Sequence, residues 1–332
     1  MKKLFAAILT VCVILSLAAC GGEEAPVIVT GDELGGAVGE VKTDAPVTTE
    51  APAPVEPAKN YPDNILMKDR HDTSTANVFE NEKYYRTDIA SVTVLDTLAN
   101  KPADAWDVSD EKNGTVWAWV DEGMNLFIAG EGGVTAKSCT ELFAHYEEAT
   151  AFNFGGNFYT DITEDLYRMF LYCKSLETID LNSFNVSNTD NFGELFYGCH
   201  NLRSVALESW DTSSSQSFGA MFQNCIDLEQ VDVSHFKTHN AISIGGMFWG
   251  CEKLTSVGDL GGWDVSKVKY FKWMFSDCYK LTSVGDLSGW DTSSASSMYD
   301  MFAWCKSLTS IGDLKIPDGC DTEGMFEGTS LQ

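Results

Sequence analysis

The sequence predicts an α/β repeat protein: a solenoid with a parallel β-sheet on one side and short helices on the other, preceded by a small cap that contains β-strands. Two observations predict this fold. A unit of about 26 residues is restated through the second half of the chain, and within each unit the apolar positions change from strand-like to helix-like spacing. One such unit is too small to bury its own apolar face, so each unit completes the core of the next.

The repeated unit follows the pattern (M/L)-F-x-x-C-x-x-L-x-x-(I/V)-x-(L/V)-x-x-(F/W)-(D/N/K)-(T/V)-(S/H). Complete copies begin at Met169, Leu195, Met221, Met247, Met274 and Met301, and a partial copy begins at Met325. A degenerate copy begins at Leu142, with Tyr146 where the cysteine belongs, as expected at the end of a stack. Two copies carry an extra glycine, Gly258 or Gly285, which predicts a bulge in the strand.

Each unit contains a strand signal, a turn signal and a helix signal. In the unit that begins at Met247, the positions of Leu254, Val257 and Leu260 predict a short strand. The "WDVS" that follows predicts a turn, because Asp and Ser side chains hydrogen bond to nearby backbone groups. Phe271–Cys278 has apolar residues three and four apart, which predicts one or two turns of helix.

The N-terminus carries the signals of an export leader. Lys2 and Lys3 precede an apolar run, Leu4–Leu17, that is short for a membrane span. The run ends in "LAAC", which resembles the lipobox of bacterial lipoproteins, whose cysteine thiol takes the lipid. We predict a lipoprotein signal peptide over residues 1–19 and lipidation at Cys20; the alternative is an ordinary signal peptide with a chance cysteine.

Three regions follow the predicted signal peptide. Residues 20–60, rich in Pro, Thr and Glu, predict a disordered stalk behind the acylated cysteine. Residues 61–141 predict an N-terminal cap, in which Val116–Val120 and Leu126–Ala129 are expected strands. Residues 142–332 predict the solenoid, with about seven 26-residue repeats.

The units also resemble a known family. The strand half, L-x-x-(I/V)-x-L, is similar to a leucine-rich repeat, and the whole unit resembles the bacterial surface protein 26-residue repeat, the BspA-like repeats often found on lipoproteins. The resemblance covers residues 142–332 and extends more weakly over 105–134. Phe or Trp stands where Asn or Cys normally follows the strand of a leucine-rich repeat. The resemblance implies adhesion or binding at a cell surface.

Charge and motifs exclude several classes of function. A formal net charge of −27 argues against a nucleic-acid partner, because phosphates must be met by Lys and Arg. No G-x-S-x-G, H-E-x-x-H or phosphate-loop motif is present in the sequence. The recurring cysteines lack the close pairs of a metal site and are predicted to be small buried apolar residues, with a redox or metal role as the alternative. We therefore predict a non-enzymatic protein without cofactor or metal.

Two sets of side chains are candidate contacts. An acidic column before the inner apolar residue of the strand is either solvated, bonded to local backbone groups, or held by Ca²⁺ or a cationic partner. Its members are Asp180, Asp232, Asp259, Asp286 and Asp313. Aromatic residues at variable positions are favoured in binding hot spots and are the leading ligand contacts: Tyr197, Trp249, Trp273 and Trp304. A second aromatic column is predicted to lie in the core: Phe184, Trp210, Phe236, Trp263 and Trp290.

The first functional hypothesis is an extracytoplasmic solenoid, anchored to a bacterial membrane through Cys20, that binds a protein or matrix component without catalysis. The second is a surface lipoprotein that holds a glycan or small ligand on exposed aromatics. An unrecognised hydrolase is a third, weaker hypothesis.

Overall fold

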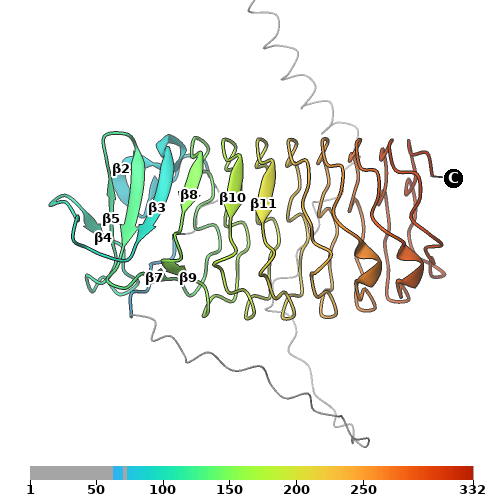
Figure 1. Ribbon diagram of the computed structural model, residues 1–332, viewed down its shortest axis with the longest axis horizontal. Coiled ribbons are helices and arrows are strands. Elements are labelled where there is room, and N and C mark those ends of the chain that lie inside the picture. Colours follow the sequence, from blue (N-terminus) through green and yellow to red (C-terminus); the bar gives the residue numbers. More distant parts are fainter. Residues whose placement is uncertain (1–62, 70–72, 332) are drawn as a thin grey trace, which may run out of the picture. The chain divides into compact units, whose positions relative to one another are not determined.

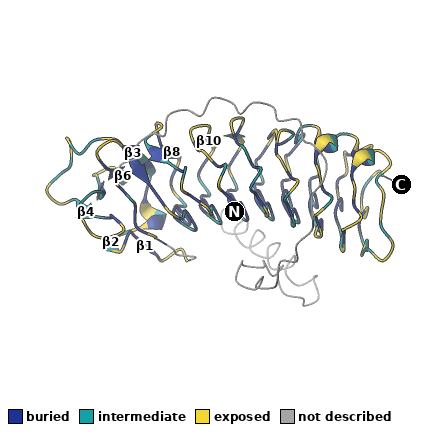
Figure 2. Cartoon of the chain, turned by 90° about the horizontal axis from the view of Figure 1, so that it is seen from below, coloured by how far each residue is buried: buried dark blue, intermediate teal, exposed yellow. Residues whose placement is uncertain are grey.

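The computed structural model describes residues 63–69 and 73–331. The predicted signal peptide, Cys20 and the stalk lie outside the described residues. The described residues form one compact unit, in which successive coils of chain lie side by side behind a strand-rich N-terminal part (Figure 1). Exposed residues gather at the turns of the coils (Figure 2).

The N-terminal part is built on a five-stranded sheet with the order β4-β5-β6-β3-β8. Strands β4 (Trp106–Asp107), β5 (Trp117–Val120) and β6 (Asn125–Ala129) are antiparallel neighbours. Strands β6, β3 (Ser91–Leu95) and β8 (Ala151–Asn153) are parallel. The two predicted strands are confirmed as β5 and β6. The sequence did not indicate β3, and β3 rather than β6 pairs with the first repeat unit.

Short elements complete the N-terminal part. Strands β1 and β2 form an antiparallel pair, and β7 pairs with β9 in parallel. A single turn of 3-10 helix, η1, follows β2 directly. Their bounds are Asn77–Val78 for β1, Asn81–Tyr85 for β2, Arg86–Asp88 for η1, Val134–Thr135 for β7 and Phe158–Tyr159 for β9.

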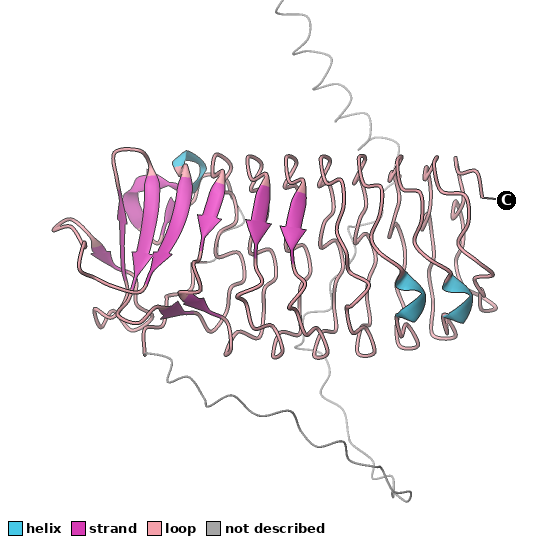
Figure 3. Cartoon of the chain, viewed as in Figure 1, coloured by secondary structure: helices cyan, strands magenta, loops and turns pink. Residues whose placement is uncertain are grey.

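The strand row continues into the repeats as β10 (Thr178–Asp180) and β11 (Ser204–Ala206), which are parallel and in register (Figure 3). Later coils keep only single bridges at this row, and 3-10 turns η2 (Leu260–Gly262) and η3 (Leu287–Gly289) follow it. In the described residues the ladder already ends at β11, because the next coil bridges only forward, from Gln230 to Ser256. The predicted extra glycine Gly258 lies in the coil after that and has a φ of 84°, a conformation outside the strand region.

The predicted short helices are wrong, because the methionine–phenylalanine segments form stacked turns. Within Phe271–Cys278, the N–H of Phe275 donates to the carbonyl of Met301 in the next coil, 2.9 Å away. The N–H of Ser276 donates instead to the carbonyl of Trp273, three residues back, at 3.2 Å. Trp273 has a φ of 58°, and a positive φ recurs four residues later. A helix needs every N–H bonded four residues back with negative φ, so none propagates.

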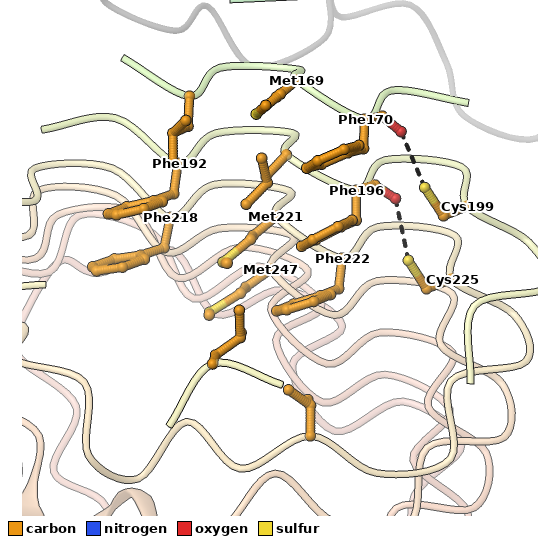
Figure 4. Packing of buried hydrophobic residues seen from close by; sticks show 14 of the residues in the cluster. Met169, Phe170, Phe192, Phe196, Cys199, Phe218, Met221, Phe222, Cys225 and Met247 are labelled. Carbon is orange, nitrogen blue, oxygen red and sulfur yellow. Dashed lines mark hydrogen bonds between the residues drawn. The ribbon is translucent and has the colours of Figure 1, made fainter. Parts of the chain in front are cut away.

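A stack of phenylalanine rings forms the spine of the core. Neighbouring rings in successive coils have centroids 5.3 to 6.0 Å apart, and Figure 4 shows three of them face to face. The members are Phe143, Phe170, Phe196, Phe222, Phe248, Phe275, Phe302 and Phe326. Phe143 belongs to the degenerate first unit, so that unit enters the core as predicted.

The second aromatic column also lies in the core, as predicted. Trp210, Trp263 and Trp290 are each at most 4% exposed. Each indole N–H donates to a backbone carbonyl of the preceding coil, at 2.8 to 3.0 Å. The hydrogen bond satisfies the one polar atom of a ring that is otherwise enclosed by apolar side chains. Burial of Trp at this column is therefore compatible with a dry core.

A buried ion pair closes the first coil. In later coils the carbonyl at the position of Ala144 accepts from the coil before it, as Trp249 accepts from Asn224 at 2.7 Å. The first coil has no such predecessor. The guanidinium of Arg86 donates to the Ala144 carbonyl at 2.9 Å and pairs with Asp69 at 2.8 Å, with both side chains buried. Arg86 thus supplies the donor that a preceding coil supplies elsewhere.

We predict that Arg86→Leu lowers the free energy of unfolding by about 3–5 kcal/mol, because it leaves the Asp69 carboxylate buried without its cation. Urea unfolding would measure the loss. The matched control is Arg203→Leu, which breaks a surface pair with Glu177 at 3.7 Å and should change stability by less than about 1 kcal/mol. Equal losses in the two variants would show that Arg86 does not close the stack.

Candidate functional site

Three positions of each stacked turn, most of them half-buried or buried, recur from coil to coil and define what we call the turn face. It consists of the residue before each repeat's methionine and the two residues before each cysteine. The first and last of these positions have positive φ in every coil, from Glu141 and His145 through Trp273 and Asp277 to Gly324 and Gly328. The strand face of the repeats bears the acidic column.

The four predicted aromatic contacts all lie on the turn face. Tyr197 is half-buried and meets Tyr172 of the preceding coil edge to face, with centroids 5.5 Å apart. Trp249 and Trp273 are half-buried and stack on each other at 5.2 Å. Trp304 lies apart from them and is 42% exposed. The structure therefore brings together Trp249 and Trp273 and leaves Tyr197 and Trp304 at other coils.

Large side chains at one turn-face position lean over glycine in the next coil. A Cβ placed on Gly198 would lie 2.4 Å from the ring of Tyr172, and one on Gly328 would lie 2.5 Å from the ring of Trp304. Only glycine leaves room for the neighbouring ring at a residue with positive φ. One face of the Trp304 ring is thus packed on backbone, while the side chain still exposes a substantial area to solvent.

The tryptophan pair is tied to carboxylates. The Trp249 indole donates to Asp277 at 3.2 Å, and the Tyr279 hydroxyl donates to the same carboxylate at 3.0 Å. The Asp300 carboxylate is hydrogen bonded by the side chain of Trp273. Burial raises the pKa of Asp300, while that hydrogen bond opposes the rise. Two carboxylates therefore lie directly against the aromatic pair, and sequence reasoning did not include either.

The acidic column caps local turns. Asp180, Asp232, Asp259 and Asp286 each accept a hydrogen bond from the backbone N–H two residues later, at 2.9 to 3.0 Å. A hydrogen bond with Ser234 lowers the pKa of Asp232. Asp313 is exposed, like the others. Local hydrogen bonding is thus the reading that the geometry supports, and within residues 63–69 and 73–331 no group of His, Cys, Asp and Glu is arranged to hold a metal ion.

The repeated cysteines are buried, as predicted, and they also act as donors. Each thiol lies 3.0 to 3.2 Å from the carbonyl oxygen of the spine phenylalanine in the preceding coil. Figure 4 shows this contact for Cys199 and Cys225. The members are Cys173, Cys199, Cys225, Cys251, Cys278 and Cys305, all free thiols. Sequence reasoning missed this hydrogen bond, although the fixed spacing of Phe and Cys in every unit was its signal. Burial raises the pKa of Cys305 to about 12.

The repeats match a family model described as "Mycoplasma protein of unknown function, DUF285" over residues 135–230, 164–260 and 256–331. Together these matches cover more than half of the chain. The chain belongs to the DUF285 family. The matched region contains the turn face, the spine and the cysteines of this DUF285 protein, and it begins after β6.

The chain was also compared with curated proteins and with solved structures. No curated protein matches this DUF285 chain. The crystal structure of a leucine-rich repeat protein from Bacteroides ovatus is similar to it, with 19% identity and a TM-score of 0.31 over 62% of this chain and 59% of that chain. The DUF285 chain thus spans less than two thirds of that protein. In its described residues, no helix has the length and apolar character needed to cross a bilayer.

The buried thiols predict a loss of stability at alkaline pH. A thiol in the unfolded chain ionises near pH 8.5, whereas the folded Cys305 stays protonated to about pH 12. The unfolded state therefore binds fewer protons above pH 8.5, and the free energy of unfolding falls by up to about 1.4 kcal/mol per pH unit for each thiol.

Urea unfolding at pH 7 and pH 10 of the native chain and of Cys305→Ser measures this effect. Serine can donate to the same carbonyl but does not titrate, so the variant should lose less stability between the two pH values. The same pH dependence in both proteins would contradict the role of the thiol.

Proposed function

We propose that this DUF285 protein is a lipid-anchored solenoid on a bacterial cell surface, and that it binds a protein or matrix partner without catalysis. The observation that carries the proposal is that the repeats have a filled core and carry further aromatic side chains on the turn face. The core columns are satisfied by stacking and by hydrogen bonds from coil to coil. The partly exposed rings of Trp249, Trp273 and Trp304 are not needed to fill that core.

Two further points support the proposal. The units resemble BspA-like repeats, which implies binding or adhesion at a cell surface. An exposed apolar ring such as Trp304 on a highly charged protein favours a contact that covers it. Glycan binding through the same rings is the competing function, and the binding experiment below includes it.

The anchor predicts the behaviour of one variant. Replacement of Cys20 by Ala removes the thiol that receives the lipid, so the variant should lose acylation and appear outside the membrane fraction or as uncleaved precursor. Metabolic labelling with a fatty acid and fractionation measure this outcome. Lipid found on another cysteine, or a mature N-terminus other than Cys20, would contradict the anchor.

The contact surface predicts a second result. We expect Trp249→Ala combined with Trp304→Ala to weaken binding of the full chain to its partner by about 2 kcal/mol or more, because exposed Trp residues dominate many interfaces. The partner would be identified by arrays of matrix proteins and glycans, and affinity would then be measured for each variant.

The control is Trp263→Ala, which empties a core position and should cost about 3–5 kcal/mol of stability. The double variant should unfold with a smaller loss than this control. If it unfolds as readily as Trp263→Ala, the turn-face rings are structural. If it folds and binds as the native chain does, the contact surface lies elsewhere.

A further inference from the structure

One patch on the turn face and directly beside it contains neighbouring rings and carboxylates. We call Trp249, Trp273, Asp277, Tyr299 and Asp300 the aromatic–acid patch. Trp249 stacks on Trp273 at 5.2 Å, and Tyr299 meets Trp273 edge to face at 5.9 Å. The Trp249 indole donates to Asp277, and the side chains of Trp273 and Tyr299 hydrogen bond to Asp300. All five side chains are half-buried, and they come from three successive coils.

Lysines of the chain already rest on the rings of this region. The Lys272 ammonium lies 4.6 Å from the centroid of Trp273. The Lys306 ammonium lies 4.5 Å from the ring of Tyr279 and 5.6 Å from that of Trp304. An ammonium within about 6 Å of a ring centroid is attracted by the negative face of the ring. The geometry therefore includes examples of the contact that a cationic ligand would make.

The charge of the patch points the same way. Within the described part of the chain, neither Asp277 nor Asp300 forms an ion pair with Lys or Arg. The negative charge of Asp277 and of Glu327 acts on Asp300 as a repulsion. Indole and phenol donors hold both carboxylates in place without neutralising them. A cation brought onto this patch would meet two fixed negative charges and the ring faces together.

We propose that the aromatic–acid patch binds a lysine- or arginine-rich segment of a protein partner, with one basic side chain taking the place that Lys272 holds over Trp273. The inference rests on the proposed binding function and names the chemistry of its partner. Cation–π attraction, the fixed carboxylates and the strongly acidic chain all favour a basic segment. The same carboxylates repel acidic glycans, and Lys272 covers the ring face on which a neutral sugar would stack.

The test uses the full chain and a hexa-lysine peptide with blocked ends, in 0.15 M salt, where long-range attraction between exposed charges is largely screened. Binding is measured by calorimetry and by tryptophan fluorescence. We expect Asp300→Asn and Trp273→Leu each to weaken binding at least tenfold. The matched controls are Asp286→Asn, with the same change of charge outside the patch, and Tyr270→Leu, which removes an exposed ring outside it. Each control should change the affinity less than twofold.

A further pair of variants keeps the test decisive if the ring substitution unfolds the chain. Lys272→Met removes the resident cation and should tighten binding severalfold. Lys267→Met removes the same charge from an exposed lysine that contacts Asn240 and should have a smaller effect. Equal effects of Lys272→Met and Lys267→Met would overturn the proposal, as would equal effects of Asp300→Asn and Asp286→Asn.

Other outcomes separate this inference from the proposed function. Equal binding of a fully acetylated peptide, or of a neutral oligosaccharide that is lost with Trp273→Leu, would show that the patch does not select cations. Absence of hexa-lysine binding in a chain that captures a matrix or glycan partner on the arrays would overturn the inference and leave the proposed function standing. If the arrays yield no partner but hexa-lysine binds in a patch-dependent way, the inference stands and the proposed function is overturned.

Discussion

The structure depends on one directional set of backbone hydrogen bonds, in which alternate N–H groups of each methionine–phenylalanine turn donate to carbonyls of the next coil. Phe222 donates to Met247, and Phe248 donates to Met274, each at 2.8 to 2.9 Å. These bonds fix each coil one repeat from its neighbour, so equivalent side chains stack into columns. The phenylalanine spine, the buried tryptophans and the cysteine thiols all follow from that alignment. The longer units have one additional residue, such as Gly258. It lies at the strand face, where the strand ladder is already interrupted, so the columns of side chains stay aligned.

Because these bonds run in one direction, the two sides of each turn require different hydrogen-bond partners. In these turns a coil's N–H groups donate to its successor and its carbonyls accept from its predecessor, whereas elsewhere in the coil N–H groups such as those of Glu229 and Lys269 donate to the preceding coil. For the first coil, Arg86 supplies a donor to Ala144, and Asp69 balances the charge that this brings into the core. A buried ion pair is a costly way to satisfy a carbonyl, because both charges lose hydration. It offers, however, a planar donor group that meets two carbonyls of the first coil at once, those of Glu141 and Ala144.

The sequence predicted which side chains form columns more accurately than it predicted the local backbone conformation. The units, the buried cysteines and the core position of Trp263 follow from spacing alone, because stacking repeats whatever a single unit buries. The helix prediction was wrong because stacked four-residue turns also place apolar side chains three and four residues apart. Glycine at the positions of positive φ would have indicated turns in the sequence, but in this unit Trp273 and Asp277 occupy those positions. Strand β3 has no counterpart in the repeat pattern. The carboxylates of the turn face were missed because they become neighbours of the rings only when coils stack.

The same stacking decides which aromatic residues the turn face can carry. A residue other than glycine at a positive φ costs roughly 1 kcal/mol or more, so a ring there must be compensated by its contacts. Trp304 gains contact with the backbone of Gly328, and Trp273 gains the stack with Trp249 and the hydrogen bond to Asp300. Each ring thus depends on residues supplied by a neighbouring coil. The surface is therefore specified by neighbouring coils together, and a single unit does not carry the aromatic–acid patch.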